Sequence, residues 1–153
     1  MTQFDQDQAP PSLEVIRQNA LQAGYFQLLD LHIDDAQDGE GTVSVHVDAR
    51  LYHPQRIVHG GVIFTLADTA MAMALMSVMP PNTLFSTIEA KINFLLPVRT
   101  GELSASATII HRGRSTVVLE ATVHNTNSKE RKAVARVLGT FHISQPRAAH
   151  VKE

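Results

Sequence analysis

The amino-acid sequence predicts an α+β domain in which one curled antiparallel sheet of five to six strands wraps round one long central helix. Three observations support this fold class. Residues 62–79 form a mostly apolar run that is long enough for a central helix and apolar on almost every side, so other elements must cover it. Four segments rich in Val, Ile and Thr follow this run. The turns between them are short, which favours antiparallel neighbours because a parallel return needs about a dozen residues or more.

The residues before the long helix predict one short helix and two strands. Ser12 precedes an amphipathic run and Gly24 follows it, and these are the start and stop signals of a helix. Residues 25–33 are short and mostly apolar, and residues 42–47 alternate with valines on one face, so both segments are predicted strands. The turn between the two strands is predicted at residues 38–41.

The long helix is predicted to begin at the pair Gly60-Gly61 and to end before Pro80. Residues 50–58 show no period, so we expect a loop that leads into the helix. The four later strands are predicted at residues 84–95, 103–111, 115–125 and 133–143.

The chain is expected to form one domain. It has 153 residues, of which 44% are hydrophobic and 18% are charged, and this is the composition of a globular chain. We find no internal repeat. The domain is predicted over residues 12–144, between a disordered polar tail at 1–11 and a loose C-terminal tail at 145–153.

Charge and composition also exclude several partners. A net charge of −2 provides no overall positive field for nucleic acid. Cysteine is absent, which excludes disulfides, thiolate nucleophiles and cysteine zinc sites and fits a cytoplasmic protein. Asp68 interrupts the apolar run, and a carboxylate at the centre of a bilayer costs about 2.5–3.5 kcal/mol. We therefore expect a buried helix of a soluble protein, with no membrane partner.

The start of the long helix is chemically informative. Gly60 and Gly61 stand where the N–H groups of a helix lack internal partners and where the positive end of its dipole lies. An anion or a developing oxyanion can bind at such a position. The alternative is that the two glycines only allow a tight turn.

Asp68 is the only ionisable residue of the apolar run. Thr65, Asp68 and Thr69 form a narrow polar stripe, because residues at i, i+3 and i+4 share one face of a helix. The stripe is either an ordinary solvent face or part of a site. Eight residues separate Gly60 from Asp68, which is about 12 Å along a helix, so the two cannot act on one carbonyl group within one chain. Two antiparallel helices of a symmetric dimer would bring them together.

Several motifs resemble those of a known family. Residues 59–61 (His-Gly-Gly), 66–68 (Leu-Ala-Asp), 87–95 (Thr-Ile-Glu-Ala-Lys-Ile-Asn-Phe-Leu) and Pro97 are similar to the hotdog-fold acyl-CoA thioesterases, in particular the phenylacetate-pathway (PaaI-like) type. The resemblance extends over about residues 25–143 and implies the hotdog fold for the predicted sheet and helix.

The resemblance also implies catalytic roles. Asp68 matches the acidic residue that acts either as a general base on water or as a nucleophile on the thioester carbonyl. Gly60 matches the residue whose N–H group polarises the thioester oxygen. His59 matches a histidine close to the reacting group, and the alternative is a purely structural role.

Two further residues are implied by the same resemblance. His53 stands where related enzymes often carry Asn or Gln, and this departure matters because only an imidazole titrates near neutral pH. Thr87 matches a Ser or Thr that orients water or the acid. Counting forward from Asp68 would select Ser86 instead, but counting back from Pro97 selects Thr87, which we prefer.

A basic turn at residues 111–115 (His-Arg-Gly-Arg-Ser) is the candidate handle for coenzyme A. Arginine forks suit phosphate oxygens, and similar enzymes hold the nucleotide near this turn; the alternative is a solvated turn. The predicted substrate- and coenzyme-A-binding residues are Gly61, Thr69, Arg112, Gly113, Arg114 and Ser115. The residues that form either an acyl channel or plain core are Phe64, Met71, Met73, Met76 and Phe94.

The sequence thus predicts an acyl-CoA thioesterase whose site is shared by two identical subunits. No cofactor or metal is expected, since coenzyme A is part of the substrate and the histidines show no metal-ligand spacing. The resemblance suggests a homodimer that pairs into a homotetramer. The main alternative is a non-catalytic acyl-CoA binding or sensing protein. A hydratase for enoyl thioesters ranks lower, because no histidine follows Asp68 within the helix. The residues leave the acyl group open.

Overall fold

The computed structural model describes residues 9–144, so both predicted tails lie outside the described residues except for residues 9–11. The helices are α1 (Leu13–Leu21), α2 (Gly24–Leu29) and α3 (Gly60–Met76), with one 3-10 turn at Ala49–Leu51. The strands are β1 (His32–Gln37), β2 (Glu40–His46), β3 (Leu84–Phe94), β4 (Glu102–Arg112), β5 (Thr116–Asn127) and β6 (Glu130–Ser144).

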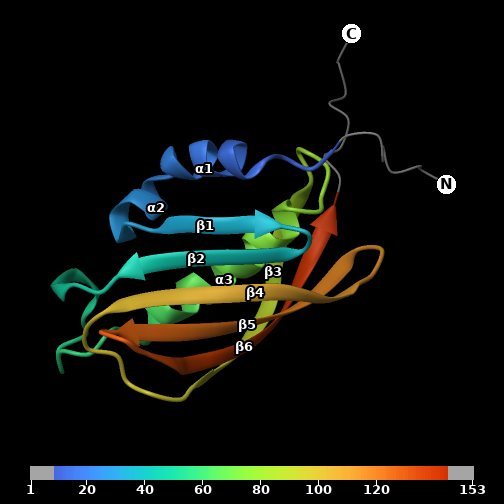
Figure 1. Ribbon diagram of the computed structural model, residues 1–153. Helices are drawn as coiled ribbons and strands as arrows, with labels where there is room; N and C mark the ends of the chain where they lie inside the picture. Colours follow the sequence, from blue (N-terminus) through green and yellow to red (C-terminus); the bar gives the residue numbers. More distant parts are fainter. Residues whose placement is uncertain (1–8, 145–153) are drawn as a thin grey trace, which may run out of the picture.

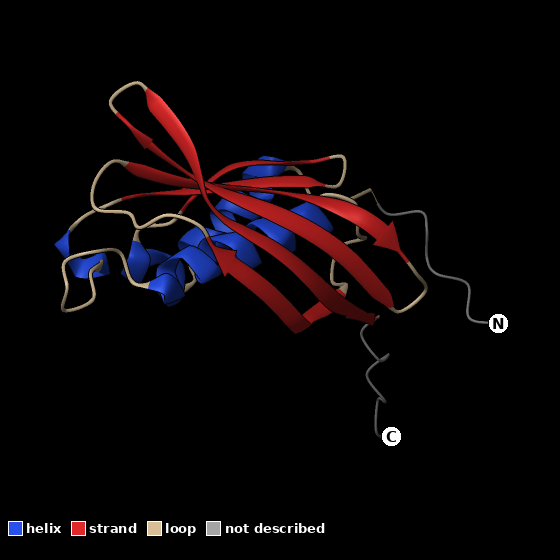
Figure 2. Ribbon diagram, turned by 90° about the horizontal axis from the view of Figure 1, so that it is seen from below, coloured by secondary structure: helices blue, strands red, loops and turns tan. Residues whose placement is uncertain are grey.

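The six strands form one sheet in the order β1-β2-β4-β5-β6-β3, and every neighbouring pair is antiparallel. The sheet curls, and α3 lies along its concave side (Figure 1). Figure 2 shows the curled sheet from below, with the long helix running along it. The predicted fold class, a curled antiparallel sheet round one long helix, is confirmed.

The sheet-facing side of α3 is buried against the strands. Leu66, Ala70 and Ala74 are completely buried against the strands. Gly41 of β2 allows the closest approach, because a Cβ atom at this position would overlap the backbone of Ala70 and Ala74. Small residues on the helix and a glycine on the strand therefore set the distance between the two layers.

The opposite side of α3 is not covered within one chain. A row of residues along it is only half-buried, so one chain leaves this side of the helix partly open. The residues of this open face are Phe64, Thr65, Asp68, Thr69, Ala72 and Met76. Among the described residues, no helix combines the length and the hydropathy needed to cross a bilayer.

The N-terminal region differs from the prediction. Ser12 caps α1 as expected, with its hydroxyl accepting a hydrogen bond from the Val15 N–H group at 3.4 Å. Gly24 does not end this helix but begins α2, and residues 25–29, predicted as strand, are helical. Phe26 and Leu29 explain the difference, because their spacing of three places both on one helical face that packs against the core.

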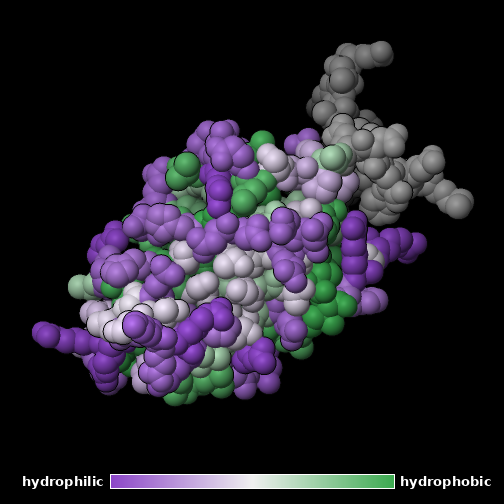
Figure 3. All heavy atoms as spheres, in the orientation of Figure 1, coloured by the Kyte–Doolittle hydropathy of each residue, from purple (hydrophilic) through white to green (hydrophobic). Residues whose placement is uncertain are grey.

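The convex side of the sheet is polar. Inward-facing residues of β2 and β4 are apolar, whereas the residues between them, such as Ser44, Ser106 and Thr108, point outward. Figure 3 shows this face as mostly hydrophilic to neutral. The apolar interior and the open face of α3 therefore lie on the other side of the sheet.

Candidate active site

Asp68 and Thr87 form the polar centre of the open face. Thr87 Oγ1 on β3 donates a hydrogen bond to Asp68 Oδ1 at 2.8 Å. Among residues 9–144, no hydrogen bond reaches the second carboxylate oxygen, Oδ2. The bond orients the carboxylate and leaves one oxygen available to accept a proton.

A β-bulge determines that Thr87, and not Ser86, reaches the helix. The pairing of β3 with β6 shifts between Thr87 and Glu89, so Ile88 is an extra residue in the strand. Beyond the bulge the even-numbered residues face α3, and before it the odd-numbered residues do. Ser86 pairs with the exposed His142 and points outward.

The first turn of α3 separates the roles of the two glycines. His59 caps the helix, and its Nδ1 atom accepts a hydrogen bond from the Gly61 N–H group at 2.9 Å. The neutral imidazole therefore carries its proton on Nε2. Within the described part of the chain, the Gly60 N–H group has no hydrogen-bond partner. Gly60 thus retains a free donor at the positive end of the helix dipole.

Phe94 lies against Gly60. A Cβ atom added at Gly60 would come within 3.1 Å of Phe94 Cζ, while the phenylalanine itself is 53% exposed. The ring therefore shields one side of the helix start without being buried in the core. Its inward direction is another result of the bulge in β3.

One chain does not bring the helix start and the carboxylate together. Gly60 and Asp68 lie about 12 Å apart along the axis of α3. His53 is also separate: its backbone N–H group donates to Ile57 O, and its Nδ1 atom accepts from the Gln55 N–H group at 3.1 Å. Among the described residues, its side chain forms no hydrogen bond with another predicted site residue.

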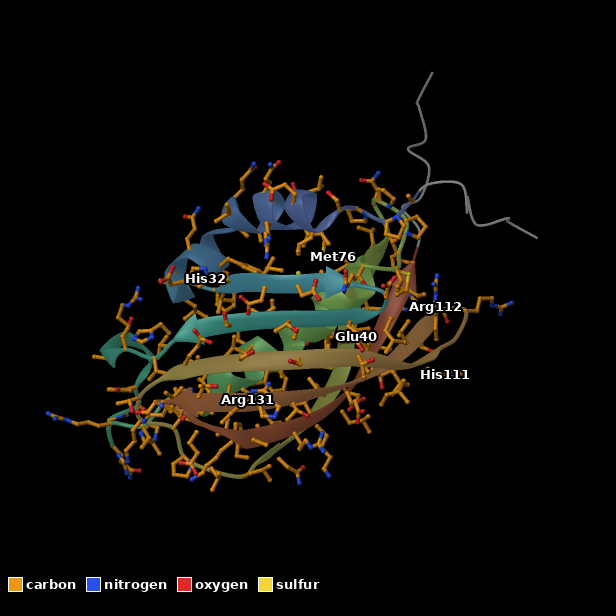
Figure 4. All side chains as sticks on the ribbon, in the orientation of Figure 1. His32, Glu40, Met76, His111, Arg112 and Arg131 are labelled. Atoms are coloured by element: carbon orange, nitrogen blue, oxygen red, sulfur yellow. The ribbon has the colours of Figure 1, made fainter. Side chains whose placement is uncertain are left out.

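The basic turn lies at the far end of α3. Ile109, just before the turn, lies beside Gly39, and Gly39 also lies beside Val78, which follows α3. Figure 4 shows Arg112 at the same end of the molecule as Met76, the last residue of the helix. Arg112, Gly113, Arg114 and Ser115 are therefore distant from Gly60 within one chain.

Sequence reasoning missed Tyr25, which joins the same face from the other flank. Its hydroxyl lies 2.8 Å from Thr65 Oγ1, although forty residues separate the two. Thr69, the third residue of the polar stripe, is half-buried on α3. No local pattern indicates the contact, because it joins α2 to α3 across a long stretch of chain. A polar line thus runs from α2 across α3 to Thr87 on β3.

Comparison with known proteins identifies the family. A family described as the thioesterase superfamily matches residues 55–132. The acyl-coenzyme A thioesterase PaaI of Escherichia coli (strain K12) is 33% identical over 116 residues, which cover 74% of this chain and 78% of the relative. The 1,4-dihydroxy-2-naphthoyl-CoA hydrolase of Listeria monocytogenes is 26% identical over 106 residues, which cover 69% of this chain and 86% of the relative.

Solved structures agree with this result. A thioesterase family protein from Silicibacter pomeroyi superposes with a TM-score of 0.80 at 25% identity, over 86% of this chain and 96% of that chain. The fold and the family match define the class: this is a hotdog-fold enzyme. The chain belongs to the thioesterase superfamily.

Proposed function

We propose that this enzyme hydrolyses acyl-coenzyme A thioesters, RCO–S–CoA + H2O giving RCOOH + CoA–SH, at a site completed by a second copy of the chain. The observation that carries the proposal is a pair of groups on α3 that have no hydrogen-bond partner among residues 9–144. One is the free N–H group of Gly60, and the other is the free oxygen of Asp68. The relatives named as a thioesterase and a hydrolase act on coenzyme A thioesters, which supports this reaction.

In this proposal the N–H group of Gly60 stabilises the oxyanion that forms on the thioester carbonyl. Asp68 of the partner either removes a proton from the attacking water or attacks the carbonyl itself, and both routes remain within the proposal. Thr87 orients the Asp68 carboxylate, and His53 and His59 position the water and the thioester. No metal or cofactor takes part. The negative charge of the oxyanion develops beside the N-terminus of α3, where the helix dipole favours it.

Two features support assembly with a second copy. Asp68 and Gly60 can meet only if two α3 helices lie antiparallel, which is the arrangement of a twofold dimer. The surfaces that would meet include apolar side chains beside the polar stripe. On the open face of α3 these are Phe64, Ala72 and Met76, and on the edge strand β3 they are Leu84, which is 59% exposed, and Ile88, which is 57% exposed. Pairing of dimers into a tetramer and a cytoplasmic location remain part of the proposal.

The same assembly gives the basic turn a role. The antiparallel arrangement would carry the partner's Met76 end to a point about 12 Å beyond Gly60. Arg112 and Arg114 would then lie on the side of the site where the coenzyme A phosphates extend, and guanidinium groups suit phosphate oxygens. Gly61 and Thr69 would line the path between the thioester and this turn.

The decisive experiment is release of free thiol from a panel of acyl-CoA substrates. Asp68→Asn keeps the shape of the side chain and removes its basicity, so we expect kcat to fall by about 10³-fold. The Kd of the variant for acyl-CoA, measured by calorimetry, should stay within a few-fold of the wild-type value. Full turnover in the variant would remove the mechanism, and binding without turnover in the wild type would favour the acyl-CoA binding alternative.

A further inference from the structure

Tyr25 reaches across the open face of α3 on the flank opposite β3. Its hydroxyl lies 2.8 Å from Thr65 Oγ1. Thr65 stands three residues before Asp68, and side chains at this spacing are neighbours on a helix, about 5–6 Å apart at Cβ. The tyrosine is thus held within about one helical turn of the carboxylate that the proposed function places at the reaction centre.

The helix that carries Tyr25 exposes apolar surface at this position. None of the residues of α2 is fully buried, and Tyr25 and Leu28 are 55% and 68% exposed. A helix of six residues without a side-chain N-cap is not stable alone. Phe26 and Leu29 attach α2 to the core, and the hydrogen bond between Tyr25 and Thr65 ties it to α3.

These contacts match the needs of an acyl group. A thioester has a polar carbonyl, which requires hydrogen-bond donors, and an apolar acyl group, which requires apolar surface beside them. Asp68 and Thr87 lie toward β3, whereas the aromatic ring of Tyr25 and the side chain of Leu28 come from the opposite flank. Apolar surface is therefore available within one turn of the reacting carbonyl.

We propose that Tyr25 is a specificity-determining residue whose ring, together with Leu28, forms the end wall of the acyl site. This inference rests on the proposed function. The hydroxyl bond to Thr65 prevents the ring from turning aside, so the wall is fixed. A wall one turn from the carboxylate admits a compact acyl group, such as an aryl group, and obstructs a long linear chain.

The test compares kcat/KM for benzoyl-CoA and octanoyl-CoA by thiol release. Tyr25→Ala opens the wall, so the ratio of octanoyl to benzoyl activity should rise about tenfold. Tyr25→Phe and Thr65→Val remove only the hydrogen bond and keep the apolar volume, so the ratio should rise about two- to threefold. Val15→Ala is the matched control, because Val15 is an exposed apolar residue of α1, and the ratio should stay at the wild-type value.

The outcomes separate this inference from the proposed function. If the wild type releases thiol and all the Tyr25 and Thr65 variants keep the wild-type ratio of octanoyl to benzoyl activity, the inference that Tyr25 forms the end wall is overturned. The proposed thioesterase activity is then unaffected. If Tyr25→Ala does not fold, the two milder variants decide the result. If the wild type releases no thiol from any substrate, the proposed function is contradicted, and so is the role of Tyr25 that rests on it.

Discussion

The two faces of α3 have opposite properties although they belong to one helix. The face toward the sheet consists of fully buried small and branched residues such as Leu66 and Ala70. The open face carries Thr65, Asp68 and Thr69, all half-buried and placed between hydrogen-bonding side chains from two other elements. Stability therefore depends on the sheet-facing side of α3, and the proposed chemistry depends on its open face.

A large loss of activity is expected at the start of α3, which begins at Gly60. Gly60→Pro removes the N–H group, and proline is tolerated at the first position of a helix. Activity should fall by about 10²–10³-fold, the usual loss for one oxyanion donor. Gly60→Ala is the matched control, because it adds the same Cβ atom beside Phe94 but keeps the N–H group. Equal losses of thiol release in both variants would assign the effect to crowding and not to the donor.

Substitution on the covered face should affect stability. Leu66→Ala leaves a cavity under the sheet and should lower the free energy of unfolding by about 3 kcal/mol, measured by chemical denaturation. Thr69→Ala on the open face is the comparison, with an expected loss within about 0.5 kcal/mol. A similar loss in the two variants would show that the faces do not differ as described.

A smaller effect is expected on the convex face of the sheet, away from both sides of α3. Burial, followed by the charges of Arg131 and Arg136, lowers the pKa of His124 below its ordinary value of 6.5. The unfolded chain therefore binds this proton more readily than the folded protein, and stability contributed by the neutral ring is lost as the pH falls below about 6.5.

The melting temperature at pH 7.5 and pH 5.5 measures this effect. The fall in Tm on acidification should be about 1 °C smaller in His124→Gln than in the wild type. The loss of activity caused by Asp68→Asn should be unchanged in the same background, because the imidazole lies on the other side of the sheet. An identical fall in Tm in the two proteins would contradict the assignment to His124.

Much of the fold could be predicted because its signals are local and repeated. The apolar run that became α3 and the four later strands follow from periodicity and turns, and their observed bounds differ from the predicted ones by a few residues. The prediction for the N-terminal region was wrong, because the structure there depends on tertiary packing. Tyr25 and Phe26 favour a strand by composition, but packing of Phe26 against the core makes α2 helical.

For the candidate site, the sequence indicated residue types but not their geometry. The spacing of Gly60 and Asp68 indicated two separate groups, because the rise of a helix is constant. The sequence did not reveal the bulge at Ile88, which turns Thr87 toward the helix, because a bulge changes the register without a compositional signal. The contact between Tyr25 and Thr65 was missed for the same reason: it joins elements that are distant in the chain.

The most direct test of the central claim is complementation between two inactive subunits. Asp68→Asn and Gly60→Pro chains carry different tags, are expressed together, and the mixed dimer is purified through both tags. If Gly60 of one chain acts with Asp68 of the other, each mixed dimer contains one intact and one doubly defective site, so thiol release should return to about half of the wild-type value. A mixed dimer as inactive as its parents would contradict the shared site.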